Sequence, residues 1–109
     1  MVERLRMLMR WREYIGILRD AIREILPGCN AYVIGGAAEN RLTAKSDIDV
    51  LIVCENPPRN AYELAKKKAR IREILEEKGI EWSYLFEFHI VDKKTAQKYL
   101  QGKPRIKIT

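Results

Sequence analysis

The sequence has 109 residues, with 21 Lys and Arg against 15 Asp and Glu and a net charge of +6. This length suits one domain spanning residues 1–109 with a single core. A composition that is 47% hydrophobic and 33% charged excludes a disordered chain and a membrane-embedded one. No apolar run approaches the roughly 20 residues that a spanning helix needs.

The two cysteines, Cys29 and Cys54, are too few for a disulfide framework and lack the spacing of metal ligands. We interpret them as small buried hydrophobic residues. Residues 1–12 mix Arg with Leu and Met, which argues against a secretory signal. A reducing cytoplasm is therefore the expected location.

The positive charge is concentrated in residues 92–109, which contain six basic residues and only one acidic residue, Asp92. Such a surplus attracts nucleic acid, nucleotide phosphates or an acidic partner protein, and a solvated tail is the plain alternative. The hypothesis of a nucleic-acid-binding domain is supported by this charge alone, because the basic residues match no recognised motif. The basic residues are Lys93, Lys94, Lys98, Lys103, Arg105 and Lys107.

The first half of the chain predicts one helix and two strands. Apolar residues recur at three- and four-residue spacing over 3–26, which predicts a helix that ends at Pro27. The apolar run 31–34 predicts a buried strand, stopped by a Gly-Gly pair. The polar segment 37–46 is expected to hold one helical turn, closed by Asn40 in a left-handed conformation.

The β-branched run 47–53 predicts a second strand. Asn60 and Glu63 form a capping box for a helix that runs to Gly79. Residues 82–91 alternate and predict a third strand, followed by a short helix capped by Asp92. One side of that strand would carry Trp82, Tyr84, Phe86, Phe88 and Ile90, and the other Leu85, Glu87, His89 and Val91.

The element order is thus α-β-β-α-β-α, which predicts a small mixed α/β domain, or α+β domain, with helices packed mainly on one face of the sheet. The aromatic side of the third strand is expected to be core. A base-stacking platform would have to be exposed.

The feature richest in chemistry is Gly35-Gly36, then ten residues, then Asp47-Ile48-Asp49 at the start of a hydrophobic strand. Alternate strand residues share a face, so Asp47 and Asp49 are expected to project together. Their mutual repulsion would be relieved by a divalent cation such as Mg²⁺. A solvated turn is the alternative for an isolated Asp-x-Asp.

Glu87 offers a third carboxylate, because it is the only acid inside the otherwise apolar third strand. Three carboxylates on neighbouring strands could hold two metal ions for phosphoryl transfer. At a sheet edge Glu87 could instead point into water. His89 shares its face and could bond a ligand carboxylate or bind substrate, but we favour a structural role for it.

The glycines fit the same chemistry. A Gly-Gly pair at a strand end lets phosphate oxygens approach backbone N–H groups, although alone it is merely a tight bend. Arg41, Lys45 and the hydroxyl of Ser46 lie on the connecting segment and could neutralise a triphosphate.

These residues resemble the nucleotidyltransferase superfamily that includes DNA polymerase β, and most closely its small stand-alone branch, the minimal nucleotidyltransferases. The family pattern is a hydrophobic strand with Gly-Gly or Gly-Ser, about ten residues, Asp-x-Asp within a strand, and a later acid. Here it reads YVIGG (32–36), SDIDVLIV (46–53) and FEFH (86–89).

The resemblance implies transfer of a nucleoside monophosphate, usually AMP from ATP, with Mg²⁺. Asp47, Asp49 and Glu87 would hold the metal, Glu87 would also act as the base, and Gly35 and Gly36 would face the phosphates. Family members often pair with a small HEPN-domain protein and act as the antitoxin that nucleotidylates it.

The alternative function is a binding module that keeps the fold and works by docking on a partner protein. The short sheet favours completion of the cleft by a partner or by a second copy of the chain, a homo-oligomer.

Overall fold

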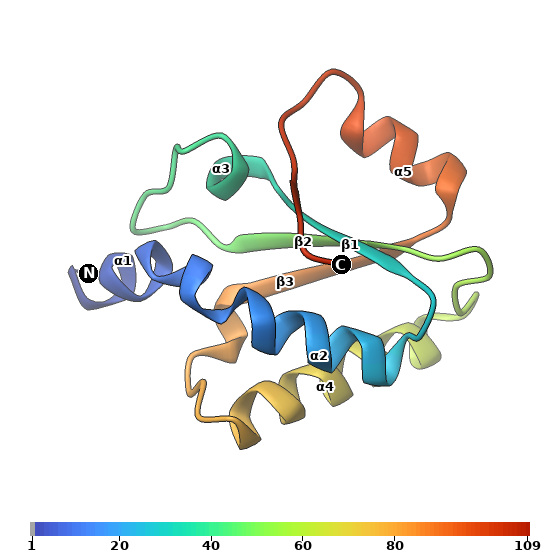
Figure 1. The fold of residues 1–109 in the computed structure, drawn as a ribbon, viewed down its shortest axis with the longest axis horizontal. Helices are drawn as coiled ribbons and strands as arrows, with labels where there is room; N and C mark the ends of the chain where they lie inside the picture. Colours follow the sequence, from blue (N-terminus) through green and yellow to red (C-terminus); the bar gives the residue numbers. More distant parts are fainter. Residues whose placement is uncertain (1) are drawn as a thin grey trace.

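The computed structural model describes residues 2–109 as a four-stranded sheet with helices around it (Figure 1). The strands are β1 (Asn30–Ile34), β2 (Ile48–Val53), β3 (Phe86–Val91) and β4 (Ile106–Lys107). Their order is β3-β2-β1-β4; β1 is antiparallel to β2 and β4, whereas β2 and β3 are parallel. This confirms the predicted mixed α/β fold. No helix within residues 2–109 is both long and apolar enough to cross a membrane.

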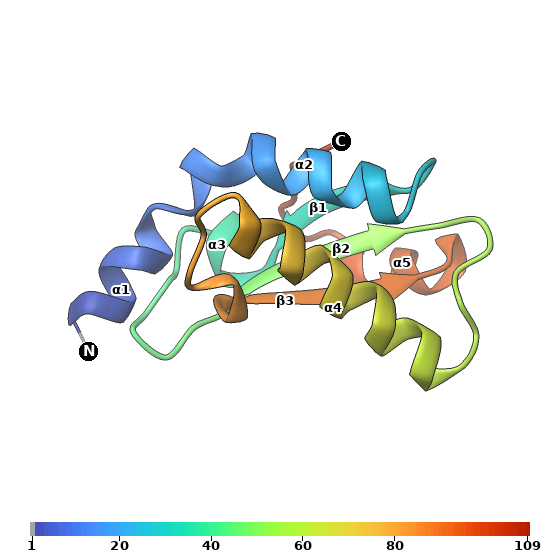
Figure 2. The same ribbon diagram turned by 90° about the horizontal axis from the view of Figure 1, so that it is seen from below.

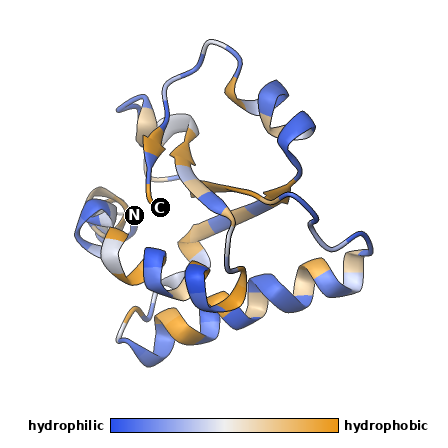
Figure 3. Ribbon diagram, turned by 45° about the vertical axis from the view of Figure 1, so that its right-hand side comes forward, coloured by the Kyte–Doolittle hydropathy of each residue, from blue (hydrophilic) through white to orange (hydrophobic). Residues whose placement is uncertain are grey.

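One face of the sheet carries the main core. The helices α2 (Ile15–Ile25) and α4 (Ala61–Glu77) lie side by side on it (Figure 2). Because β2 and β3 are parallel, their connection must cross over the sheet, and α4 makes that crossing. In Figure 3 the strands are largely hydrophobic, whereas the helices show hydrophobic patches between hydrophilic stretches. The strand residues buried in this core are Ala31, Val33, Ile48, Val50, Ile52, Phe86, Phe88 and Ile90.

The opposite face of the sheet is covered only in part. There α5 (Lys93–Leu100) packs Ala96 against Ile34 and Leu51 in a second, smaller apolar cluster. Alternate residues of β2 and β3 point to this face, so it also carries Asp49 and Glu87, which both remain accessible to solvent.

The predicted helix over residues 3–26 is interrupted, which corrects the sequence analysis. The chain forms α1 (Val2–Met9), a 3₁₀ turn η1 (Trp11–Tyr14) and then α2. Leu8, Trp11 and Tyr14 are spaced by three residues and all pack in or against the core. A spacing of three residues fits the three residues per turn of a 3₁₀ helix, so these side chains keep their contact with the core through the interruption.

The predicted helix caps and turn are confirmed. The Asn60 side chain accepts a hydrogen bond from the Glu63 N–H at 2.8 Å, and Asp92 accepts one from the Thr95 N–H at 2.7 Å. A single helical turn, α3 (Gly35–Ala38), follows β1. Asn40 has φ 58°, the left-handed conformation expected of it.

The third strand begins later than predicted. Residues Ser83–Leu85 form a second 3₁₀ turn, η2, so the alternation expected from residue 82 starts only at Phe86. Tyr84 is consequently 65% exposed instead of lying beside buried Trp82. The two-residue strand β4 was not predicted, since Ile106 and Lys107 are too few to show a periodicity.

Cys29 and Cys54 form a disulfide, which corrects the interpretation of both as small buried hydrophobic residues. Asn30 of β1 pairs with Val53 of β2, so the two cysteines occupy the next opposed positions, with Cα atoms 4.6 Å apart. The strand register brings the two cysteines together. The spacing of two cysteines in the sequence does not reveal that register, so the disulfide could not be predicted. Disulfides are rare in cytosolic proteins outside hyperthermophiles, so this one does not favour the reducing cytoplasm expected from the sequence.

Candidate functional site

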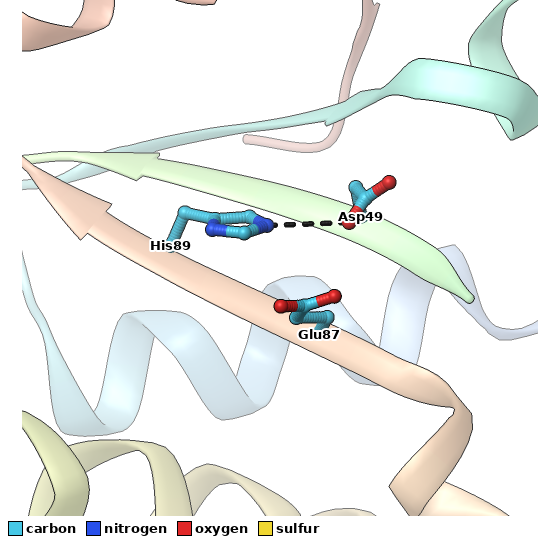
Figure 4. A group of neighbouring side chains, drawn as sticks. All are labelled: Asp49, Glu87 and His89. Carbon is cyan, nitrogen blue, oxygen red and sulfur yellow. Dashed lines mark hydrogen bonds and ion pairs between the residues drawn. The ribbon is translucent and has the colours of Figure 1, made fainter.

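Asp49 and Glu87 are direct neighbours across the parallel strands β2 and β3. Their Cα atoms are register partners, so both side chains leave the same face of the sheet (Figure 4). The Asp49 side chain is 32% exposed and Glu87 is exposed. The two predicted carboxylates therefore meet, and solvent can reach them.

His89 joins this pair. Its Nε2 lies 3.2 Å from Oδ1 of Asp49, and each of Asp49, Glu87 and His89 offers one ligand atom within 4.8 Å of the others. The ring also packs against Tyr99 of α5, with ring centroids 5.6 Å apart. His89, for which we favoured a structural role from the sequence, thus lies within the polar cluster.

Asp47 lies just before β2 and is held elsewhere. Its Oδ1 accepts a hydrogen bond from Nη2 of Arg4 at 3.0 Å, and its side chain is 44% exposed. Asp47 is therefore not among the residues whose ligand atoms lie close enough together to hold one metal ion, which are Asp49, Glu87 and His89. Arg4 was absent from the sequence interpretation, because its partner is 43 residues away along the chain.

Gly35 provides the space that Asp49 occupies. Its φ is +69°, and a Cβ added there would lie 2.8 Å from Oδ2 of Asp49. Glycine adopts this conformation without the steric cost that other residues meet. Gly36 differs, because the nearest atom to an added Cβ is the carbonyl oxygen of Arg41 at an ordinary 3.5 Å. The first glycine is therefore structurally required and the second is not.

The loop between Gly36 and Asp47 carries the other predicted nucleotide-binding residues. Arg41 is paired with Glu39 at 2.9 Å, and Lys45 is exposed. The Ser46 hydroxyl oxygen accepts a hydrogen bond from the Thr43 N–H at 2.9 Å. Arg41 and Ser46 thus contact other residues of this loop in the structure.

A pocket of about 310 Å³ opens beside Gly35. Glu39 lines it together with Lys98 and Lys103, and both lysines belong to the basic C-terminal segment. Tyr99 lies in the same wall and touches His89, so the pocket and the cluster are adjacent. The basic surplus is visible in the sequence, but its place beside Gly35 is not, because Lys98 and Lys103 reach this pocket only in the folded chain.

The cluster has the chemistry of a divalent-metal site. Two carboxylates and an imidazole converge, and a cation among them would offset the repulsion between Asp49 and Glu87. Oxygen and imidazole nitrogen are common ligands of divalent ions. The residues present therefore fit a divalent metal ion.

The fold and this site define a class of protein. Residues 15–106 match the family model of the nucleotidyltransferase domain. The chain belongs to that family, in agreement with its resemblance to the polymerase β-like superfamily. No curated protein matches the sequence.

Two solved structures share the fold. One, from Sulfolobus solfataricus, is provisionally described as a nucleotidyltransferase and is 13% identical, with a TM-score of 0.60 over 93% of this chain and 84% of its own. A second structure with the same provisional description is 22% identical, with a TM-score of 0.51 over 83% of this chain and 91% of its own. At such identities the likeness concerns the fold.

Proposed function

We propose that this chain is a metal-dependent nucleotidyltransferase that moves a nucleoside monophosphate, AMP from ATP, to a hydroxyl acceptor. The observation that carries the proposal is the opposed pair Asp49 and Glu87, with Gly35 packed against Asp49 and opening on the adjacent pocket. The family membership of residues 15–106 supports the same class of reaction.

Asp49 and Glu87 would hold Mg²⁺. Asp47 would also bind the metal once its ion pair with Arg4 had opened. A two-ion site is the expected form, and when bound the ions would neutralise the triphosphate and polarise its α-phosphate. The protein's own contribution is to position carboxylates that are already opposed in the sheet.

The nucleotide would lie in the pocket beside Gly35, with its phosphates toward the backbone of Gly35 and Gly36. Lys98 and Lys103 line that pocket and supply positive charge. Arg41, Lys45 and Ser46 would contribute from the loop, although Arg41 would first have to leave Glu39.

In the reaction, the acceptor hydroxyl oxygen forms a bond to the α-phosphorus and the bond from that phosphorus to the bridging oxygen breaks. The electron pair leaves with pyrophosphate, and the hydroxyl proton passes to Glu87. Glu87 suits this role because it is the most exposed member of the cluster and can approach an incoming hydroxyl.

The acceptor is proposed to be a hydroxyl on a partner protein, of the HEPN-domain kind that minimal nucleotidyltransferases modify as antitoxins. A partner or a second copy of the chain would also complete the open side of the pocket. We propose that the reaction takes place in the cytoplasm, where nucleoside triphosphates are available, with the Cys29–Cys54 bridge as an instance of the disulfides that hyperthermophiles keep in that compartment.

The test is a calorimetric titration of ATP with and without Mg²⁺. The native chain should bind ATP in a Mg²⁺-dependent way, and a variant carrying Asp47→Asn and Asp49→Asn should lose that binding. Asp20→Asn, an exposed acid on α2, is the matched control and should bind as the native chain does. Metal-dependent binding that survives in the double variant would remove the proposed site.

The alternative is a binding module that docks on a partner. The ion pair between Arg4 and Asp47 favours it, because it occupies one predicted metal ligand. In that case neither ATP nor Mg²⁺ would change the thermal midpoint, since a ligand that binds the folded state must stabilise it.

A further inference from the structure

The donor set that the fold assembles is two oxygens and one nitrogen rather than three oxygens. Asp49, Glu87 and His89 form the group within 4.8 Å, while the Asp47 carboxylate is bonded to Arg4. We propose that His89 is a direct metal ligand through Nε2 and that the site selects a first-row transition dication such as Mn²⁺ over Mg²⁺. This inference rests on the proposed function and specifies its metal.

The position of His89 on β3 supports the assignment. It lies two residues after Glu87, on the same face of the strand, and pairs in register with Leu51, two residues after Asp49. The ring can therefore reach back along the sheet toward both carboxylates. Figure 4 shows it extending from β3 toward Asp49, with the Glu87 carboxylate beside it.

The ring is held in this orientation from both sides. Nε2 is 3.2 Å from Asp49 Oδ1, and Tyr99 packs on the ring from α5. Only 24% of the His89 side chain is exposed. A ligand that is already oriented loses little conformational freedom when the ion binds. The nitrogen that faces the carboxylates is the atom that would bind the metal.

The chemistry of the donors sets the selectivity. Mg²⁺ prefers oxygen ligands in a strict octahedron and keeps several waters, so an imidazole offers it little. First-row transition dications accept imidazole nitrogen alongside carboxylate oxygen, as in sites of two histidines and one carboxylate. A site that includes His89 should therefore bind Mn²⁺ more tightly than Mg²⁺.

The composition of the chain makes a direct test possible, because it contains one histidine. In the tag-free protein, imidazole ¹⁴N coupling seen by pulsed electron paramagnetic resonance of bound Mn²⁺ must come from His89. The native chain should show the coupling of a directly bound nitrogen. Competition should place the Mn²⁺ dissociation constant at least about tenfold below that of Mg²⁺, the scale on which single metal-site contacts act.

Two variants complete the experiment. His89→Gln should lose the nitrogen coupling and weaken Mn²⁺ binding by about tenfold while changing Mg²⁺ binding little, because only the transition ion uses the nitrogen. Asp49→Asn should weaken both ions. Should His89→Gln fail to fold, the spectrum of the native chain still decides the question.

The contrary outcomes separate this inference from the proposed function. Mn²⁺ that binds, is lost in Asp49→Asn and shows no directly bound nitrogen would overturn the role of His89 and leave the carboxylate site standing. Equal losses of Mn²⁺ and Mg²⁺ in His89→Gln would mean that His89 only positions Asp49. No binding of either ion, with or without ATP, would remove both the inference and the proposed metal-dependent function.

Discussion

Arg4 of α1 holds Asp47, the first acid of the Asp-x-Asp motif, with Nη2 of Arg4 3.0 Å from Oδ1 of Asp47. The same guanidinium donates to the carbonyls of Ala44 and Ser46, at 2.8 and 3.0 Å. Arg4 therefore ties the N-terminal helix to the segment that leads into β2. It also places a positive charge where the proposed function requires a metal ligand.

Replacing Arg4 should strengthen metal binding. At about 4 Å in water a unit charge repels a dication by about 2 kcal/mol, and screening by salt reduces this to about 1 kcal/mol, equivalent to about fivefold in affinity. Arg4→Gln removes that charge, so we expect Mg²⁺ to bind about fivefold more tightly. The partly exposed ion pair should contribute less than about 1 kcal/mol to the free energy of unfolding. Calorimetry and urea denaturation measure the two effects.

Arg6→Gln is the matched control, because Arg6 is exposed on the same helix. It removes the same charge from α1 without touching the segment before β2. Metal binding that is unchanged or weaker in Arg4→Gln would show that Arg4 supports the geometry of the loop more than it competes with the ion.

The two glycines should respond differently to alanine. At Gly35 the left-handed conformation costs a side-chain-bearing residue about 1–2 kcal/mol, and the added Cβ would displace the Asp49 carboxylate. Gly35→Ala should therefore lower both the free energy of unfolding and metal affinity. Gly36→Ala is the control and should be neutral, or stabilising by up to about 1 kcal/mol, because alanine suits a helical position better. Equal losses in the two variants would contradict the geometry.

The local helices, strands and caps could largely be predicted from the sequence, whereas the cluster of Asp49, Glu87 and His89 could not. Strand alternation identified the faces of Asp49 and Glu87, and the cap at Asn60 was readable from residues close in the chain. The register of β2 and β3 opposes Asp49 to Glu87, which are distant in sequence. The hydrogen bonds that join His89 to Asp49 and Arg4 to Asp47 connect residues 40 and 43 positions apart. Such contacts depend on tertiary packing, which local patterns do not encode.

Loss of the Cys29–Cys54 bridge should destabilise the fold. The bridge spans 25 residues of sequence and limits the unfolded chain, which for a loop of this length corresponds to about 3 kcal/mol. The double variant Cys29→Ser, Cys54→Ser should unfold at a lower temperature by calorimetry, and the reduced native chain should behave like it. A native midpoint that does not respond to reductant would contradict the bridge.

The cap of α5 should titrate at low pH. A hydrogen bond from the Thr95 N–H is the main cause that lowers the pKa of Asp92 from its ordinary value, and the nearby charges of Lys94 and Lys98 assist. Since the folded pKa is depressed, the stabilisation is complete above the unfolded value and is lost as the pH falls through the folded one. The Thr95 amide signal in NMR should therefore titrate with a midpoint below the ordinary aspartate value of about 3.9. Asp92→Asn, an equally good cap that does not ionise, should abolish that titration. A midpoint at or above the ordinary value would mean that the carboxylate does not cap the helix that carries Lys98 and Tyr99.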